Sequence, residues 1–303
     1  MNKVVLALDL GGTNARFAAV RSDGEILARI RVPTIKNGTA EQILDLLVKN
    51  FGEISAGVGA VAIAAAIPAL INTDSGVLQK LPNLPALEGI DLAEVLKERT
   101  GLDTFIENDA TAATIGEHWL GACKGFDNVV GITLGTGIGG GLIFNGKPFR
   151  GNGGSAGEIG HVCVEPNGVS CGCGSHGCVE QYASGTAIAR MAREAGLVAA
   201  TSVDVFDLGK SGDKKALDVF TSMGAYLGIA IAGLVNVLNP DMIVVCGGVT
   251  AGWELFTDSV RDEVKKRAYR DPAERAKIIR GSLGDDAGIL GVAKVAFDIM
   301  SKN

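Results

Sequence analysis

The sequence predicts an α/β protein made of two similar halves, and three observations lead to this fold class. Short apolar runs rich in β-branched residues, which are typical of buried strands, alternate with stretches of helix-compatible spacing. A strand followed by a glycine turn occurs twice, with Asp9 in the first copy aligned on Thr133 in the second. The length of 303 residues, 47% of them hydrophobic, is enough for about two domains.

The predicted elements follow in chain order. The apolar runs predict strands over 4–8, 58–67, 129–134 and 242–245. Between them, spacing and good helix formers predict helices over 41–50, 92–100, 110–120, 184–195, 224–238 and 255–267. No low-complexity tract marks a linker, so the boundary between the halves is placed near Asn108.

The internal repeat aligns residues 5–14 with residues 129–138, and strand-like runs follow over 15–20 and 141–144. Each copy therefore predicts a β-hairpin whose turn lacks side chains. Two such turns facing one another across a cleft would hold a polyphosphate. The alternative is that they are two ordinary tight turns.

Charge and composition exclude several classes of protein. The net charge is −6, and no cluster of five basic residues provides a footprint for nucleic acid. The first apolar run meets Asp9 too early for a signal peptide, and the apolar stretches over 56–71 and 224–238 fall short of a membrane span. We therefore expect a cytoplasmic protein whose six cysteines are mostly reduced, so that clustered cysteines indicate a metal site.

The first glycine turn is a candidate phosphate site. Gly11 and Gly12 let the backbone approach phosphate oxygens, and the neighbouring Thr13 can add a hydroxyl group. Asp9 can hold hydrated Mg²⁺, although it could equally be a turn residue. The candidate cofactor-binding residues here are Asp9, Gly11, Gly12, Thr13 and Asn14.

The second glycine turn partly matches two nucleotide motifs. Residues 135–140 fit G-x-G-x-x-G, but strand-forming residues follow, where a dinucleotide-binding site needs a helix. Residues 141–148 nearly fit the P-loop, except that Pro148 replaces the required serine or threonine. We interpret the P-loop match as chance and do not favour a dinucleotide-binding site at residues 135–140.

Three cysteines and a histidine have the spacing of a structural zinc site. Thiolate and imidazole ligands on a glycine-rich loop suit tetrahedral Zn²⁺, whereas a disulfide between Cys171 and Cys173 would be strained. Cys163 and His176 are spare candidates in the same segment. The predicted ligands are His161, Cys171, Cys173 and Cys178.

Acidic residues near this cluster are candidates for binding a neutral ligand with many hydroxyl groups. Glu158 lies three residues before His161, and Glu180 lies two after Cys178, so one metal would hold the loop that carries them. The alternative is that both acids lie on the solvated surface. Asp109, at a strand end running into a helix, could be a general base or simply an N-cap.

Taken together, these residues resemble the ROK family of sugar kinases, most closely its bacterial glucokinase branch, over essentially the whole length. The most specific part is the zinc loop, residues 157–161 followed by 171–180. The two glycine turns resemble the family's two phosphate loops.

The resemblance implies an actin/hexokinase-like ATPase fold, with two RNase H-like domains around a central cleft. The N-terminal domain would comprise 1–108 plus 289–303, with the last helix returning to it, and the C-terminal domain 109–288. Asp109 would be the base that takes the proton from the 6-hydroxyl of the sugar. The resemblance also implies sugar contacts from Asn83, Asn108, Asp109, Glu158, His161 and Glu180, phosphate contacts from Gly135, Thr136 and Gly137, and adenosine contacts from Gly247 and Gly248.

We therefore expect an ATP-dependent glucokinase with Mg²⁺ and structural Zn²⁺, and a homodimer. Related kinases for N-acetylglucosamine, N-acetylmannosamine, fructose or allose share the same hydroxyl-binding residues. Ala69 stands where the family usually has glycine after the proline, which leaves the exact sugar open. A sugar-sensing repressor would carry a helix-turn-helix ahead of the first turn, whereas eight residues precede Asp9. A non-catalytic sugar-binding module is the remaining alternative.

Overall fold

The computed structural model describes residues 3–72, 75–81 and 83–302. Contacts between residues group the chain into two compact units, which are described separately. The first unit comprises Met1–Gly125, Gly141–Gly157 and Ser282–Asn303, and the second comprises Phe126–Gly140 and Glu158–Gly281.

A five-stranded sheet forms the centre of the first unit. Its order is β3-β2-β1-β4-β7, in which β1, β2 and β3 are antiparallel and β1, β4 and β7 are parallel. A small antiparallel pair, β5 and β6, follows β4 in the chain. The bounds are β1 (Val4–Leu10), β2 (Asn14–Arg21), β3 (Ile26–Pro33), β4 (Ala60–Ile67), β5 (Leu70–Ile71), β6 (Leu78–Lys80) and β7 (Thr104–Asn108).

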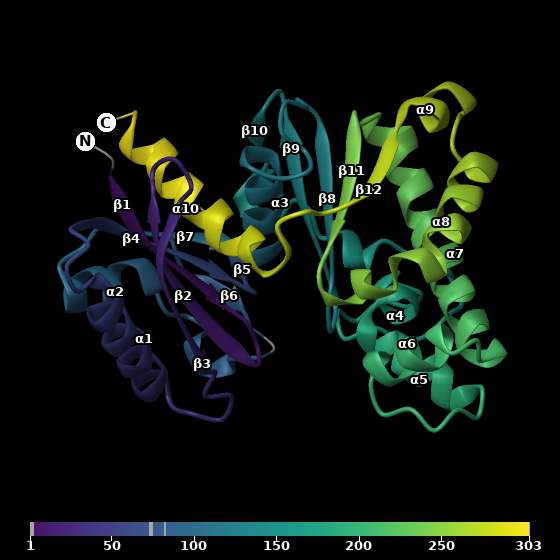
Figure 1. The fold of residues 1–303 in the computed structure, drawn as a ribbon, viewed down its shortest axis with the longest axis horizontal. Coiled ribbons are helices and arrows are strands. Elements are labelled where there is room, and N and C mark those ends of the chain that lie inside the picture. The colour runs from purple at the N-terminus through teal and green to yellow at the C-terminus, as the bar shows by residue number, and fades with distance from the viewer. Residues whose placement is uncertain (1–2, 73–74, 82, 303) are drawn as a thin grey trace. The chain divides into compact units, whose positions relative to one another are not determined.

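Both faces of this sheet are covered, because successive side chains of β1 point to opposite sides. Leu6 and Leu8 join the core under α1 and α2, whereas Val5 and Ala7 join the core under α10. Figure 1 shows the C-terminal helix α10 alongside β1 and α3. The helix bounds are α1 (Ala40–Ser55), α2 (Leu92–Thr100), α3 (Asp109–Trp119) and α10 (Ala287–Met300).

A second five-stranded sheet has the order β10-β9-β8-β11-β12. Its strands β9 and β10 pair antiparallel, and β8, β11 and β12 pair parallel. The strand order and directions therefore repeat those of the first sheet, as the two-halves prediction requires. The bounds are β8 (Val129–Leu134), β9 (Ile138–Phe144), β10 (Lys147–Pro148), β11 (Met242–Cys246) and β12 (Lys277–Arg280).

The second unit contains most of the helices between β10 and β12. The long helix α7 packs against α8 and buries Phe220, Leu227 and Ile231 among other side chains. By length and composition α7 could cross a membrane, but its many buried residues are those of a core helix. The bounds are α4 (Glu180–Ala183), α5 (Gly185–Glu194), α6 (Ser202–Lys210), α7 (Lys214–Leu238), α8 (Trp253–Arg267) and α9 (Arg270–Arg275).

All four predicted strands and all six helices predicted from spacing are confirmed as elements, with bounds that differ by a few residues except in α7. That helix begins at Lys214, ten residues before the predicted start. The contact grouping places α3 with the first unit, whereas the prediction began the second domain at Asp109. The boundary between folding domains stays a prediction.

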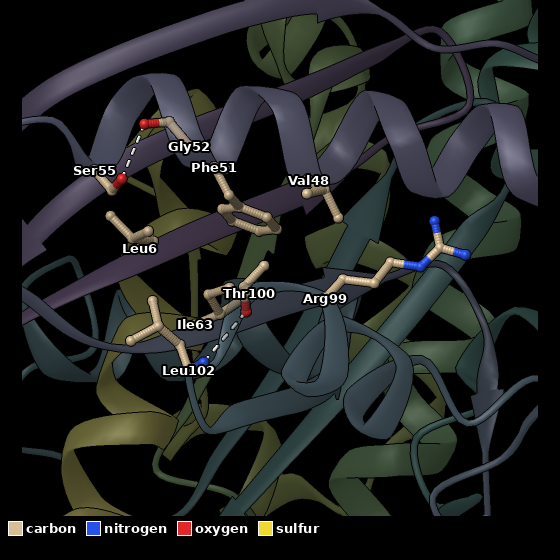
Figure 2. A pocket seen from close by; sticks show the side chains of 9 residues that line it. All are labelled: Leu6, Val48, Phe51, Gly52, Ser55, Ile63, Arg99, Thr100 and Leu102. Carbon is tan, nitrogen blue, oxygen red and sulfur yellow. Dashed lines mark hydrogen bonds between the residues drawn. The ribbon is translucent and has the colours of Figure 1, made fainter.

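A hollow of about 240 Å³ lies in the first unit between α1, the end of α2 with the loop that follows it, and the sheet. Figure 2 shows its mostly apolar lining, with Leu6, Phe51 and Ile63 around it and the Arg99 side chain reaching outward. None of the predicted site residues lines this hollow.

Candidate functional site

The first glycine turn joins β1 to β2 and is closed by its own backbone. The Gly11 amide donates to the Asn14 carbonyl at 3.0 Å, and the Thr34 hydroxyl donates to the Gly11 carbonyl at 2.7 Å. A Cβ atom on Gly12 would lie 3.0 Å from the Asn83 side chain. The structure thus brings Asn83, a predicted sugar contact, directly against this turn.

Asp9 lies just before this turn and is held by an ion pair. Arg16 on β2 donates to the Asp9 carboxylate at 3.0 Å and to Asp285 at 3.1 Å. Burial raises the pKa of the Asp9 carboxyl group above its ordinary value, Arg16 opposes this effect, and the negative charge of Asp285 adds to it.

Asn108 and Asp109 lie where β7 ends and α3 begins. The N-cap of α3 is Asn108, whose side-chain oxygen accepts from the Thr111 amide at 3.0 Å. The N-cap alternative considered for Asp109 is therefore wrong, because the helix begins at Asp109, one residue earlier than that alternative requires. The Asp109 carboxylate accepts from the Ala110 amide at 2.8 Å.

The strand register places Asp9 and Asn108 at the same edge of the first sheet. Asp9 pairs with Ala66 of β4, and the next β4 residue, Ile67, pairs with Asn108. Two strand spacings of about 4.8 Å separate the two backbones by roughly 10 Å. The carboxyl ends of these parallel strands therefore carry a candidate cation-binding acid and a candidate base together.

Ala69, the position where the sequence departs from the family, contacts this edge. The Asn108 side-chain amide donates to the Ala69 carbonyl at 3.3 Å, and Ala69 itself is buried. The backbone at Ala69 therefore orients a residue predicted to contact the sugar.

A partly buried ion pair between Arg150 and Glu107, the residue before Asn108, was not predicted. Both the Nε and an Nη atom of Arg150 donate to the same carboxylate oxygen of Glu107, at 2.9 and 2.5 Å. The other Glu107 oxygen accepts from the Asn108 amide at 3.1 Å. The only sequence signal was an acidic residue at the end of a buried strand, and its partner lies 43 residues further along the chain.

In the second unit, the second glycine turn joins β8 to β9. The Gly135 amide donates to the Gly137 carbonyl at 3.0 Å across the turn, which also contains Thr136. Glu180 contacts the turn, because one of its carboxylate oxygens accepts from the Ile138 amide at 2.8 Å. The alternative that Glu180 is a solvated surface acid is therefore wrong.

Gly247 and Gly248 follow β11 beside this turn. Gly247 has φ +92°, and a Cβ atom there would lie 2.3 Å from the Leu134 carbonyl oxygen, so only glycine fits. The Thr250 hydroxyl donates to the Gly247 carbonyl at 2.7 Å. Gly248 is exposed and has open space around it.

The predicted zinc ligands converge in the second unit. One ligand atom from each of the four residues lies within 4.8 Å of the other three. The sulfur atoms of Cys173 and Cys178 are 3.6 Å apart, and the Cys171 sulfur is 3.6 Å from His161 Nδ1. Tetrahedral ligands about 2.3 Å from a zinc ion are separated by about 3.8 Å, so this donor set fits Zn²⁺.

The surroundings of this cluster support the choice of ligands. The spare candidates Cys163 and His176 are exposed and lie outside the group of converging atoms. Burial raises the pKa of the Cys178 thiol to about 12, so a thiolate there needs a nearby cation. The Tyr182 hydroxyl accepts from the Val169 amide at 2.8 Å and ties the loop to α4.

His161 uses its two ring nitrogens in different directions. Its Nδ1 faces the cluster, and its Nε2 lies 3.8 Å from the Glu158 carboxylate. Burial raises the pKa of Glu158, His161 lowers it, and the charge of Glu180 raises it further. The two predicted acids are therefore close enough to influence one another, although the Glu158 side chain is 45% exposed.

The predicted site residues thus form one group in each unit. The first unit holds Asp9, Gly11, Gly12, Thr13, Asn14, Asn83, Asn108 and Asp109. The second holds Gly135, Thr136, Gly137, Glu158, His161, Cys171, Cys173, Cys178, Glu180, Gly247 and Gly248.

Comparison with known proteins covers almost the whole chain. Residues 5–299 match the model of the ROK family. A glucokinase of Thermotoga maritima is 34% identical over 305 residues, which cover 96% of each chain. Among solved structures, a ROK hexokinase from Thermus thermophilus is similar at TM-score 0.86 and 33% identity, covering 99% of this chain and 100% of that one. A ROK family glucokinase from Streptomyces griseus, in complex with glucose and AMPPNP, is similar at TM-score 0.85 and 32% identity, covering 97% and 99%.

Proposed function

Because the chain belongs to the ROK family and has its actin/hexokinase-like ATPase fold, we propose that it transfers a phosphoryl group from ATP to the 6-hydroxyl of glucose. The observation that carries the proposal is the edge of the first sheet, where Asp9, the first glycine turn and Asn108–Asp109 lie together. The relatives named above as glucokinases support glucose as the acceptor.

In the proposed reaction, the 6-oxygen of the sugar attacks the γ-phosphorus of ATP and ADP leaves. Asp109 accepts the hydroxyl proton and orients the oxygen for in-line attack. Backbone amides of the two glycine turns stabilise the phosphate charge, because they are fixed in place before the reaction. Asn83, Asn108, Glu158, His161 and Glu180 hold the remaining hydroxyl groups, which keeps one alcohol aligned.

Two metals belong to this proposal. Asp9 would hold hydrated Mg²⁺, which screens the negative charge of the phosphates. His161 and the three cysteines would hold Zn²⁺ as a structural ion that stabilises the loop carrying Glu158 and Glu180. A homodimer and a cytoplasmic location stay predictions from the sequence.

The proposed role of Asp109 is tested by replacing it with asparagine, which keeps its shape and removes the base. We expect kcat of Asp109→Asn for glucose to fall about 10²- to 10⁴-fold, with a much smaller change in the KM for glucose. Steady-state kinetics with Mg-ATP measures both. A variant that retains wild-type turnover would instead support a non-catalytic sugar-binding module.

The proposed acceptor is tested with a panel of sugars in an ATP-consumption assay. We expect the highest kcat/KM with glucose among glucose, fructose, allose, N-acetylglucosamine and N-acetylmannosamine. Conversion of an acetamido sugar with glucose left unphosphorylated would overturn the choice of glucose and keep the kinase reaction.

A further inference from the structure

Residues 180–186, which follow the zinc-binding cysteines in the chain, contact the second glycine turn through hydrogen bonds. Besides the contact of Glu180 with the Ile138 amide, the Gly185 amide donates to the Gly135 carbonyl at 2.8 Å. The Thr186 hydroxyl donates to the Thr136 carbonyl at 2.9 Å. Three hydrogen bonds thus hold a turn that is closed by one of its own.

The turn and the segment also pack too closely for larger residues. A Cβ atom on Gly137 would lie 2.4 Å from the Glu180 carboxylate, and one on Gly185 would lie 2.9 Å from the Gly135 carbonyl oxygen. The glycines at these two positions therefore allow the segment to dock against the turn.

The direction of these bonds determines where the amides of the turn point. In a trans peptide the carbonyl and the following N–H point in opposite directions, and the chain has no cis peptide bond among its described residues. Because the carbonyls of Gly135 and Thr136 point toward α5, the amides of Thr136 and Gly137 point away from it. Amides presented in this way are donors for an anionic phosphate oxygen.

From this arrangement we infer that Thr186 and Glu180 are positioning residues for the phosphoryl donor. Thr186 holds the Thr136 carbonyl and Glu180 holds the Ile138 amide, so that the Thr136 and Gly137 amides of the second glycine turn face the ATP phosphates. The inference rests on the proposed function, because it takes this turn as a donor-phosphate site. It also gives Glu180 a second role beside its predicted sugar contact. Thr186 has only the positioning role.

Thr186→Val tests the inference, because it keeps the shape of the side chain and removes the hydroxyl donor. Thr186 is exposed on the first turn of α5, so the fold tolerates the change. We expect the KM for ATP to rise about 3- to 10-fold, the range expected for one lost hydrogen bond, while the KM for glucose stays within about two-fold. AMPPNP affinity, measured by calorimetry, should fall by the same factor.

Two variants serve as controls. Thr186→Ser keeps a hydroxyl group and should restore most of the ATP affinity. Arg193→Ala changes an exposed residue further along α5 and should behave as wild type.

Glu180→Gln tests the second positioning residue. It should raise the KM for both substrates, because Glu180 is also a predicted sugar contact.

Unchanged AMPPNP affinity in Thr186→Val, or an equal rise of both KM values, would overturn the inference. Failure of the proposed function looks different, because the wild-type protein would then phosphorylate no hexose. The AMPPNP measurement would still test the positioning role in that case, by comparing Thr186→Val with Thr186→Ser.

Discussion

At the scale of single residues, the fold removes the ionisable side chain of Asp9 from water. Its carboxylate is largely buried, and burial raises its pKa in spite of the ion pair with Arg16. The folded protein therefore binds a proton at Asp9 more tightly than the unfolded chain does. Such a group contributes stability below its unfolded pKa of 3.8, and this contribution is lost as the pH rises through the folded pKa.

We predict that this contribution appears as a difference between wild type and Asp9→Asn. The free energy of unfolding of wild type relative to Asp9→Asn should be most favourable below pH 3.8 and should decline as the pH rises, because asparagine does not titrate. Denaturant unfolding at a series of pH values measures the difference. Arg16→Gln should make the decline larger and extend it to higher pH, since it removes the opposing charge. A difference that rises with pH would contradict the assignment.

The residue scale is also where prediction from sequence reached its limit. The pattern Asn108–Asp109 allowed either a base or an N-cap at Asp109. The backbone geometry excludes the N-cap, and the role of Asp109 as a base stays a prediction. The contact between Glu180 and Ile138 could not be predicted, because the residues are 42 positions apart and meet only in the tertiary fold. Cysteine spacing was more informative, since a metal site restricts ligand types and separations together.

At the scale of elements, α2 was predicted within its observed bounds because both ends carry local signals. Asp91 caps its start by accepting from the Glu94 amide, and Gly101 ends it with φ +74°. The start of α7 was missed, although Asp213 caps it, because its first turns carry less apolar sequence than the rest. The short strand β12 and helix α9 bury few side chains, so no hydrophobic period marks them.

Helix α1 contains a glycine that the fold does not need. Gly52 lies inside the helix beside the hollow of Figure 2, and a Cβ atom there would meet no atom within 4 Å. We predict that Gly52→Ala stabilises the protein by about 0.5–1 kcal/mol, because alanine loses less backbone entropy in a helix. Thermal unfolding should show a rise in Tm with unchanged activity.

Gly57, just after α1, is the matched control. It also has open space around it, but its φ of +78° strains any other residue. Gly57→Ala should therefore lower the Tm. Equal changes in Tm for Gly52→Ala and Gly57→Ala would show that the backbone conformation of the glycine does not determine the effect of the substitution.

The zinc loop gives a prediction about metal removal. Cys173 and Cys163 are both exposed, but only Cys173 belongs to the converging ligand atoms. We predict about one zinc ion per wild-type chain, loss of that ion in Cys173→Ser with a lower Tm, and retention in Cys163→Ser. Elemental analysis and calorimetry measure the two effects. A zinc-free wild-type protein with full activity would contradict the structural role.

At the scale of the whole molecule, the repeat seen in the sequence corresponds to two sheets of the same topology. Each begins with an antiparallel hairpin, adds one more antiparallel strand outside it and two parallel strands on the other side. Only the hairpin portion of the repeat was visible in the sequence. The remaining strands correspond in their position in the sheet, although their residues do not align. Packing in a sheet restricts the polarity of the side chains and the length of a strand more than it restricts the identity of each residue.

The first unit is also assembled from both ends of the chain. Leu290 and Ala293 of α10 pack in the same core as Val5 and Ala7 of β1. During synthesis at about 5–20 residues per second, the strands of the N-terminal sheet are therefore made roughly 10–40 s before the helix that covers them. Until translation ends, the apolar side chains on that face of the sheet lack the helix that covers them in the folded unit.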